Sequence, residues 1–574
     1  MSELTLREAE GADSTFNAWT RRLVRVLAGV LTLLAIGVLT LGVLHAVRTG
    51  RIFEYTEAPV FASLTAFRRA GSLSALYPVG GWTAPPLVLT LYPPIYFVLS
   101  AAVMAIPGVG GSLLAPRLVG CVALAGCLEA LIGIARTRGH PWTWAALLAG
   151  GALVLVPGIR SLAGSAQVDV LAMFWTLAGV RFVLRARALE AGAGSEGEDS
   201  ASWGSGSGAR SSSAPAAETR RTTPLLAAAA AFFVLAVFTK QSFVAAPIAL
   251  VLDELRRGRT RRALVGAAGF VCVVGAGMLV LQAWTNGGYL LNTVGALGHG
   301  FEFQNVTAVL ADAKLWMWAP LLGLLIALLA AGRQRRRRPA SFAVLYAALT
   351  WVVHGTATLK TGSSINYFLE PVFASVLLVF TLPAPTPRAI LNRVRPGPHL
   401  LGTASLLGML AVAVPAGQDL VSNLAEVWRH TGLTIVMNGL DGRSPLVDAS
   451  AFPDVIRAGS LPFLNDPYAF GLLSRAGMWN ASVLGDRLQA GDVPFVLTVF
   501  DLMAGRNVRV SSPAGGAGFA YFWYLDDVWQ PIVERYAVHR GPGFFVWQPR
   551  GERDASRDPG SAPPRDTSRI RDRS

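Results

Sequence analysis

The sequence predicts a polytopic α-helical membrane protein with about 11 transmembrane helices, followed by a small extracytoplasmic α/β domain. Apolar runs divide residues 24–416, arginine is concentrated in every second gap between them, and hydropathy falls after residue 417. The longer runs approach the roughly 20 residues needed to cross a ~30 Å hydrocarbon core. These clearest runs are Val24 to Val47, Leu113 to Ala135, Ala263 to Trp284, Leu315 to Ala331 and Leu400 to Ala416.

The arginine pattern predicts the orientation of these spans, because cytoplasmic loops carry the excess of positive charge. All arginine-rich gaps fall on one side if residues 1–23 are a cytoplasmic tail and eleven spans follow. The apolar run Ile95 to Ile106 is too short to be another span, and counting it would invert every later loop. We predict a helix at the outer face there, within a first external loop of residues 48–112. The expected location is the cytoplasmic (inner) membrane.

Composition predicts the remaining boundaries. Residues 186–222 are rich in Gly, Ser and Ala and are expected to form a disordered cytoplasmic linker. Residues 417–550 contain apolar runs of strand length and are long enough to bury a core of their own, which predicts the extracytoplasmic α/β domain. Residues 551–574 are dominated by Arg, Asp, Ser and Pro and are expected to form a disordered tail.

The charge and cysteine content exclude several functional classes. The net charge of +15 comes mainly from arginines in the cytoplasmic gaps, so it indicates topology and attraction to anionic lipid rather than nucleic-acid binding. The three cysteines lie within predicted spans, and the external portion has none, so no disulfides are expected there. That portion also lacks a nucleophile elbow, a glycine-rich phosphate loop and a His or Cys ligand cluster.

Carboxylates at the outer membrane surface are the first candidates for chemistry. Glu54 and Glu57 are three residues apart in the first external loop and share a face if this segment is helical. Asp169 stands at the outer start of the fourth span, a depth at which ionisable groups are functional hypotheses. The alternatives are an ordinary interfacial segment for the glutamates and a stabilised helix N-terminus for Asp169.

Lysines supply the candidate cations. The chain has only Lys240, Lys314 and Lys360, and the topology puts all three near the outer face. Lys240 lies in a tight turn between two short spans, and Lys360 opens a polar loop that enters a later span. Two cations converging on one outer cavity would suit a phosphate or pyrophosphate group, whereas the alternative is interfacial snorkelling. His354 is expected to be a satisfied interfacial histidine.

The order and sidedness of these motifs resemble the GT-C superfamily of membrane glycosyltransferases, in particular its protein mannosyltransferase and lipid A aminoarabinose transferase branch. The resemblance covers about residues 20–416. It rests on the acidic first-loop motif, the Tyr92-Pro93-Pro94-Ile95-Tyr96 segment, Asp169, the Lys240 hairpin and an external C-terminal domain. It implies transfer of a sugar from a polyprenyl-phosphate donor to a lipid, glycan or protein acceptor outside the cytoplasmic membrane.

The resemblance also implies a set of site residues. Thr56-Glu57 stands where the family has Asp-Glu, so the general base is left open between Glu57 and Glu54, and Asp169 matches the second acidic position. Lys240 matches the family's hairpin lysine, with Gln241-Ser242 in place of Gly-Pro. Candidate donor-phosphate ligands are Lys240, Lys360, Asn366 and Tyr367; candidate cavity residues are Tyr92, Tyr96, Gln167, Gln241 and Glu370.

The implied reaction is a single displacement that inverts the anomeric centre. A base deprotonates the acceptor hydroxyl while cations stabilise the leaving phosphate. No ligand set dictates a metal, so we expect metal-independent transfer, with a divalent metal as the alternative. The alternative function is a non-catalytic transporter or assembly factor for envelope glycans with the same fold, which the missing first Asp favours.

Overall fold

The computed structural model describes about three fifths of the chain. Several sequence predictions fall outside that part: Glu54, the middle of the linker, the spans Leu315 to Ala331 and Leu400 to Ala416, most of Val24 to Val47, and the tail 551–574. The described residues are 26, 40, 52–137 without 53, 54, 81, 84, 110 and 111, 165–199, 214–307 without 299, 302, 304 and 305, 342–381 without 361, 362 and 364, 443–504 without 500, and 522–550 without 542 and 543.

The chain forms two compact units. The helical unit comprises Met1–Gly81 and Val88–Arg429, and the sheet unit comprises Trp82–Leu87 and His430–Ser574. The short segment Trp82–Leu87 is therefore part of the sheet unit, although the chain on both sides of it belongs to the helical unit.

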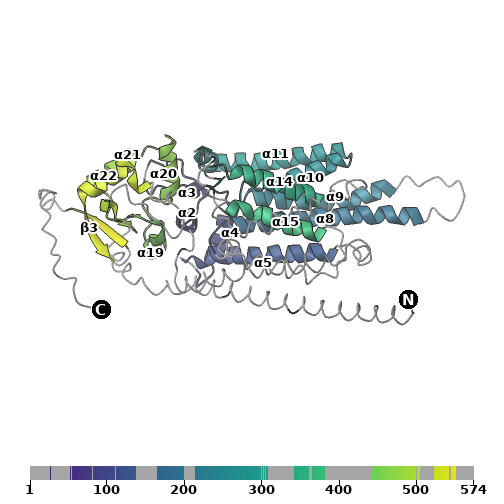
Figure 1. Cartoon of the computed structure of the whole chain (residues 1–574), viewed down its shortest axis with the longest axis horizontal. Coiled ribbons are helices and arrows are strands. Elements are labelled where there is room, and N and C mark those ends of the chain that lie inside the picture. Colours follow the sequence, from purple (N-terminus) through teal and green to yellow (C-terminus); the bar gives the residue numbers. More distant parts are fainter. Residues whose placement is uncertain are drawn as a thin grey trace, which may run out of the picture. The chain divides into compact units, whose positions relative to one another are not determined.

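The described part of the helical unit is built from helices alone, coloured purple to green in Figure 1. The pairs α8 and α9, α5 and α8, α10 and α14, and α14 and α15 pack against each other most extensively. The elements are α2 (Glu57–Ala70), α3 (Leu73–Leu76), α4 (Ile95–Met104), α5 (Leu114–Thr137), α8 (Asp169–Asp199), α9 (Ala214–Val237), α10 (Ala245–Arg256), α11 (Thr260–Trp284), α12 (Gly288–Thr293), η2 (Gly295–Leu297), α14 (Phe342–Ala357), η3 (Ile365–Phe368) and α15 (Leu369–Thr381).

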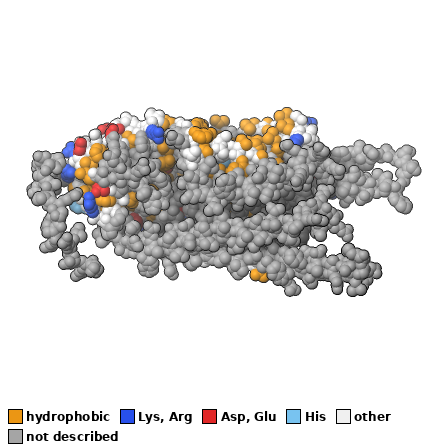
Figure 2. Space-filling model, viewed as in Figure 1, with side chains coloured by type: hydrophobic (Ala, Val, Ile, Leu, Met, Phe, Trp, Pro, Cys, Tyr) orange, Lys and Arg blue, Asp and Glu red, His pale blue; other side chains and the backbone are white. Residues whose placement is uncertain are grey.

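Two helices in the described part are long and apolar enough to cross a membrane: Leu114–Ile134 within α5, and α11. The apolar stretch of α5 is half buried, whereas that of α11 is not buried at all. Large apolar side chains of α11 such as Leu264, Val271 and Leu279 are exposed, and hydrophobic side chains gather on the described surface in Figure 2. An exposed run of apolar side chains of this kind suits lipid. The count of eleven spans stays a prediction.

Helices α8 and α9 form the longest close pair. Gly179 of α8 permits this approach, because an added Cβ would lie 2.5 Å from the Phe233 ring of α9. Both helices run further than composition predicts: α8 continues to Asp199 and α9 begins at Ala214, inside the range expected to be a linker. Alanine and glutamate in these extensions are good helix formers, which the Gly and Ser content obscured.

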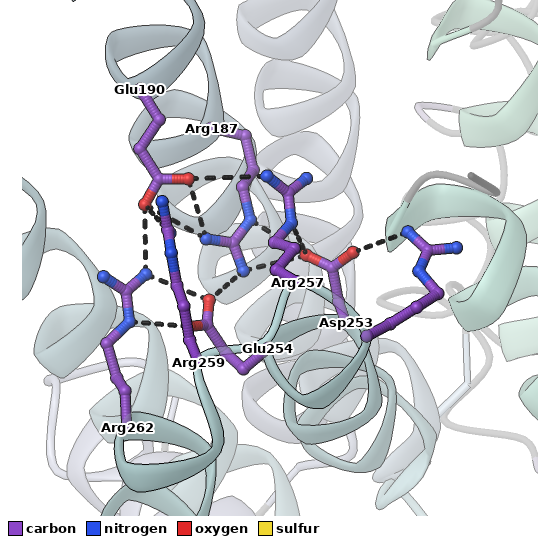
Figure 3. A network of polar contacts seen from close by, with 8 residues as sticks. Arg187, Glu190, Asp253, Glu254, Arg257, Arg259 and Arg262 are labelled. Atoms are coloured by element: carbon purple, nitrogen blue, oxygen red, sulfur yellow. Dashed lines mark hydrogen bonds and ion pairs between the residues drawn. The ribbon is translucent and has the colours of Figure 1, made fainter. Parts of the chain in front are cut away.

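An ion network joins α8, α10 and α11 (Figure 3). Arg187 of α8 lies at its centre, 6 % exposed, and pairs with Asp253, Glu254 and Glu190. Arginines at the turn between α10 and α11 complete the network: Arg256, Arg257, Arg259 and Arg262. Because three buried carboxylates share these arginines, the charges are compensated within the fold.

The sheet unit contains a four-stranded sheet of order β1-β2-β4-β3 with helices, in yellow-green in Figure 1. Strand β1 pairs parallel with β2, and β4 pairs antiparallel with both β2 and β3. The elements are β1 (Leu446–Val447), η5 (Ala449–Ala451), α19 (Phe452–Arg457), α20 (Pro467–Arg475), α21 (Ser482–Ala490), β2 (Val496–Thr498), η6 (Leu502–Ala504), η7 (Phe522–Tyr524), α22 (Asp526–Arg535), β3 (Tyr536–Gly541) and β4 (Phe544–Pro549).

Local sequence accounts for these elements. Asp466 caps α20 by accepting from the Ala469 N–H at 2.9 Å, and Pro467 occupies the first helical position. The segment Trp82–Leu87 is held by backbone bonds: the Leu87 N–H donates to the Phe463 carbonyl at 2.8 Å. The Trp479 indole N–H donates to the Trp82 carbonyl at 2.9 Å. The sheet unit is therefore discontinuous in sequence.

Candidate functional site

The start of α2 carries a buried ion pair. Glu57 is the first residue of α2 and is 0 % exposed, and Arg117 of α5 is 1 % exposed. The Arg117 Nε donates to Glu57 Oε1 and its Nη2 donates to Oε2, both at 2.8 Å. Parallel bonds of this kind fix the carboxylate in position and direction.

The same carboxylate binds the segment that leads into α8. The Ala166 N–H donates to Glu57 Oε1 at 2.6 Å, although 109 residues separate them. Next to it, the Gln167 side-chain amide donates to the Thr56 hydroxyl at 2.7 Å. Residues Thr56 and Glu57, at the position of the acidic motif, therefore lie beside the start of α8, which carries Asp169.

Asp169 and Lys240 form a second buried ion pair. Asp169 lies in the first turn of α8, where a carboxylate also favours the helix N-terminus. Lys240 follows α9 in a tight turn, and its Nζ contacts Asp169 Oδ1. The exposed fractions are 1 % for Asp169 and 3 % for Lys240, so each charge depends on its partner for compensation.

Two tyrosine rings surround Lys240. Its Nζ lies 4.8 Å from the centroid of the Tyr367 ring and 5.9 Å from that of Tyr92, both within cation–π range. Two side chains hold the Tyr92 segment: the Tyr77 hydroxyl donates to the Tyr92 carbonyl at 2.7 Å, and the Gln241 amide donates to the Leu91 carbonyl at 3.0 Å. Tyr77 and Gln241 therefore fix the backbone that carries the Tyr92 ring.

Lys360 adds a second cation near Lys240. It lies between α14 and η3, where its backbone bridges Phe301. Burial and the positive charge of Lys240 lower the pKa of Lys360 to about 8. Two ammonium groups that influence each other in a partly buried place favour an anion as ligand.

Glu370 and His354 form a third buried polar cluster. Glu370 of α15 accepts from the Tyr346 hydroxyl at 3.0 Å through Oε1, and its Oε2 contacts His354 Nε2 on α14. Glu370 is 0 % and His354 1 % exposed. Asn366 is buried in η3, one residue before Tyr367.

The structure thus brings together most of the residues that the sequence predicts for the site. Lys240 forms an ion pair with Asp169 and lies within cation–π range of the Tyr92 and Tyr367 rings. Tyr96 instead packs between α4 and α5, and its hydroxyl donates to the Pro116 carbonyl at 2.8 Å. Gln241 also donates to the Thr293 carbonyl, and its own buried Oε1 has no hydrogen-bond partner in the described part of the chain.

Arg117 is the site residue that sequence reasoning missed. It lies within the apolar run Leu113 to Ala135, and an isolated arginine inside such a run is a functional signal by itself. Among the described residues, no group of three His, Cys, Asp or Glu side chains is arranged to hold a metal ion.

Comparisons with known proteins give a likeness of fold. No protein-family model matches the sequence, and no curated protein matches it. The crystal structure of ArnT from Cupriavidus metallidurans bound to undecaprenyl phosphate superposes with a TM-score of 0.52 and 13 % identity, covering 90 % of this chain and 97 % of that one. Its apo form gives a TM-score of 0.50 and 14 % identity, covering 92 % and 98 %.

The likeness covers nearly the whole of both chains, so it is not confined to a single helical motif. At this identity it bears on fold alone. The resemblance inferred from the sequence is therefore confirmed at the level of fold: this chain has the fold of ArnT.

Proposed function

We propose that this protein is a membrane glycosyltransferase that moves a hexosyl or pentosyl group from a polyprenyl-phosphate donor to an envelope acceptor on the external face. The observation that carries the proposal is the surroundings of Lys240. A buried ammonium group paired with Asp169, flanked by two tyrosine rings and close enough to Lys360 to lower its pKa, is a site prepared for a phosphate. The fold likeness to a protein crystallised with undecaprenyl phosphate agrees with this ligand.

The two lysines would bind the phosphate of the donor. When the phosphate enters, its oxygens compete with Asp169 for Lys240, because both are anions of similar hydrogen-bonding capacity. Asp169 is then released from its ion pair. Tyr367 and Asn366 lie on the same short helix and are proposed to contact the phosphate or the sugar, and the unpaired Oε1 of Gln241 is available to a sugar hydroxyl.

The reaction would be a single displacement. The acceptor oxygen forms a bond to the anomeric carbon while the bond from that carbon to the phosphate oxygen breaks. The hydroxyl proton passes to a carboxylate, and the polyprenyl phosphate leaves with the bonding electron pair, stabilised by Lys240 and Lys360. The anomeric configuration inverts.

We assign the proton-accepting role to Asp169 rather than to Glu57. A carboxylate offers about four acceptor positions, and three of those on Glu57 are used by Arg117 and the Ala166 N–H. Glu57 is thereby suited to position the start of α8, which carries Asp169. Glu54 remains the second candidate for the base.

The experiment uses the purified protein in nanodiscs with a panel of undecaprenyl-phosphate-linked sugars. We expect release of undecaprenyl phosphate from at least one donor, and loss of undecaprenyl-phosphate binding in the Lys240→Met and Lys360→Met variants. Ser375→Ala is the matched control, because it alters a partly buried polar contact between α14 and α15 that includes neither lysine. Absence of both binding and release across the panel would refute the proposal.

A second function is favoured by one observation. Both carboxylate oxygens of Glu57 accept from Arg117, and a threonine stands at the preceding position, as in a protein that keeps the fold but not the chemistry. A transporter or assembly factor for envelope glycans would bind undecaprenyl phosphate without releasing it from any donor. Binding that depends on both lysines, without turnover, would therefore favour this second function.

The proposed sidedness can be tested separately. Single cysteines at Ser207 and Ser482 in a cysteine-free background should differ in labelling by an impermeant thiol reagent in intact cells. The background matters because the native Cys272 is exposed on α11. We expect position 482 to be labelled and position 207 to be protected. The opposite result would put the C-terminal unit in the cytoplasm.

A further inference from the structure

His354 lies between two aromatic side chains that belong to different parts of the lysine site. Its ring centroid is 5.7 Å from that of Phe243, nearly perpendicular, and 6.1 Å from that of Tyr367. His354 is 1 % exposed and comes from the last turns of α14. The buried histidine ring is thus close to both Phe243 and Tyr367.

Both neighbours of His354 support Lys240. The Phe243 N–H donates to the Lys240 carbonyl at 3.1 Å, which closes the turn that presents the lysine. The Tyr367 ring lies 4.8 Å from the Lys240 Nζ. One histidine therefore contacts the residue that fixes the Lys240 backbone and the residue that lies against its ammonium group.

Glu370 fixes the orientation of the histidine. One carboxylate oxygen contacts His354 Nε2 and the other accepts from the Tyr346 hydroxyl, so the carboxylate bridges α14 and α15. Burying such a polar group costs desolvation, and apolar residues of similar volume often stabilise a core as well or better. Packing alone therefore gives no reason for a carboxylate and an imidazole here.

We propose that Glu370 and His354 are positioning residues: the carboxylate holds the imidazole ring between Phe243 and Tyr367, and that ring sets the direction of the Lys240 ammonium group. The consequence for donor binding rests on the proposed function, whereas the position of Lys240 does not. The roles differ from the sequence expectation, which made Glu370 a cavity residue and His354 an interfacial one.

The small number of lysines allows a direct test. With only three lysines in the chain, protein labelled with ¹³C at lysine Cε gives three lysine signals, and Lys240→Arg identifies one of them. The Cε shift reports the surroundings of the ammonium group whether or not the protein transfers sugar.

Two substitutions at Glu370 separate geometry from packing. In Glu370→Gln, the amide can accept from Tyr346 and donate to His354 Nε2, so the Lys240 signal should stay in place. In Glu370→Leu and in His354→Ala, the orientation of the ring or the ring itself is lost, and the signal should move. Ser375→Ala, the matched control between the same two helices, should leave it unchanged.

Undecaprenyl-phosphate binding in nanodiscs completes the test. We expect the dissociation constant to rise about tenfold in Glu370→Leu and His354→Ala and to stay at the parental value in Glu370→Gln. A Lys240 signal that stays in place in both damaging variants, or that moves equally in Ser375→Ala, would overturn the positioning role. If the signal moves as expected but Lys240→Met leaves binding intact, the proposed donor site is wrong and the positioning of Lys240 stands.

Discussion

Arg117 and Glu57 meet in a bidentate ion pair that is closed to solvent, with both nitrogen–oxygen distances at 2.8 Å. The pair joins α5 to the first residue of α2, and the same carboxylate accepts from the Ala166 N–H. Three segments far apart in sequence therefore depend on one carboxylate. Its removal should disturb both the stability and the alignment of the site.

Breaking this pair should be strongly destabilising. Arg117→Met leaves the Glu57 carboxylate buried without compensation, a change that typically costs about 3–5 kcal/mol. Glu57→Gln should also destabilise, whereas the double variant should regain most of the loss because no uncompensated charge remains. Thermal unfolding of the four proteins measures this. Losses that simply add in the double variant would contradict the pairing.

The paired carboxylate of Asp169 should be needed for turnover but not for donor binding. Asp169→Asn should lower transfer by about 10² to 10⁴, because an amide cannot accept the proton. Undecaprenyl phosphate should bind at least as tightly, since the competing anion next to Lys240 is gone. Binding and transfer are measured on the same preparation. Transfer at the parental rate would remove Asp169 from the role of base.

Donor binding should weaken above pH 8. Burial and Lys240 lower the pKa of Lys360 to about 8, so the free site loses a positive charge as the pH rises through that value. The phosphate of the donor is a diester, which is fully ionised at this pH, and undecaprenyl phosphate is a monoester with a second pKa near 6, so it is ionised there as well. The dissociation constant should rise by up to about tenfold per pH unit. Lys360→Arg keeps its charge and should flatten the profile; a parental profile in this variant would assign the pH dependence to another group.

The ion network of Figure 3 should contribute less to the stability of the fold in acid. Burial tends to raise the pKa of Glu190, but the charge of Arg187 and hydrogen bonds from Arg259 and Arg262 outweigh it and lower that pKa. A lowered folded-state pKa stabilises the fold above the unfolded value of about 4.5 and loses this contribution as the pH falls through the folded value.

The corresponding variant is Glu190→Gln. It should lower the unfolding temperature at pH 7, and the difference from the parent should shrink as the pH falls from 5 towards 3. Asp492→Asn is the control, because its ion pair with Arg487 in the sheet unit is about half exposed and is expected to contribute little. A constant difference across this pH range would exclude the charge of Glu190 as the cause.

Residue type and predicted sidedness single out Asp169 and Lys240 as candidates for one site. The two residues are in contact, whereas their side of the membrane stays a prediction. The sequence does not predict which side chains pair with each other. The pairing of Glu57 with Arg117, and of Glu370 with His354, depends on how the helices pack. The hydropathy of a run also hides a single buried arginine such as Arg117.

Helix ends were harder to predict than helix existence. The linker composition at 186–222 did not reveal that α8 continues to Asp199, since its alanines and glutamates act locally as helix formers. The membership of Trp82–Leu87 in the sheet unit had no local signal, because its backbone partners lie far along the chain.

That discontinuity imposes an order on biosynthesis. Trp82 and the Trp479 that binds its carbonyl are 397 residues apart. At an elongation rate of about 5–20 residues per second, the ribosome needs roughly 20 to 80 s to reach the second from the first. During that time the segment Trp82–Leu87 has no partners from the sheet unit. A part of the chain that is made late therefore completes the contacts of a segment that is made early. A premature stop in the sheet unit would therefore leave this early segment unpaired rather than merely remove a terminal domain.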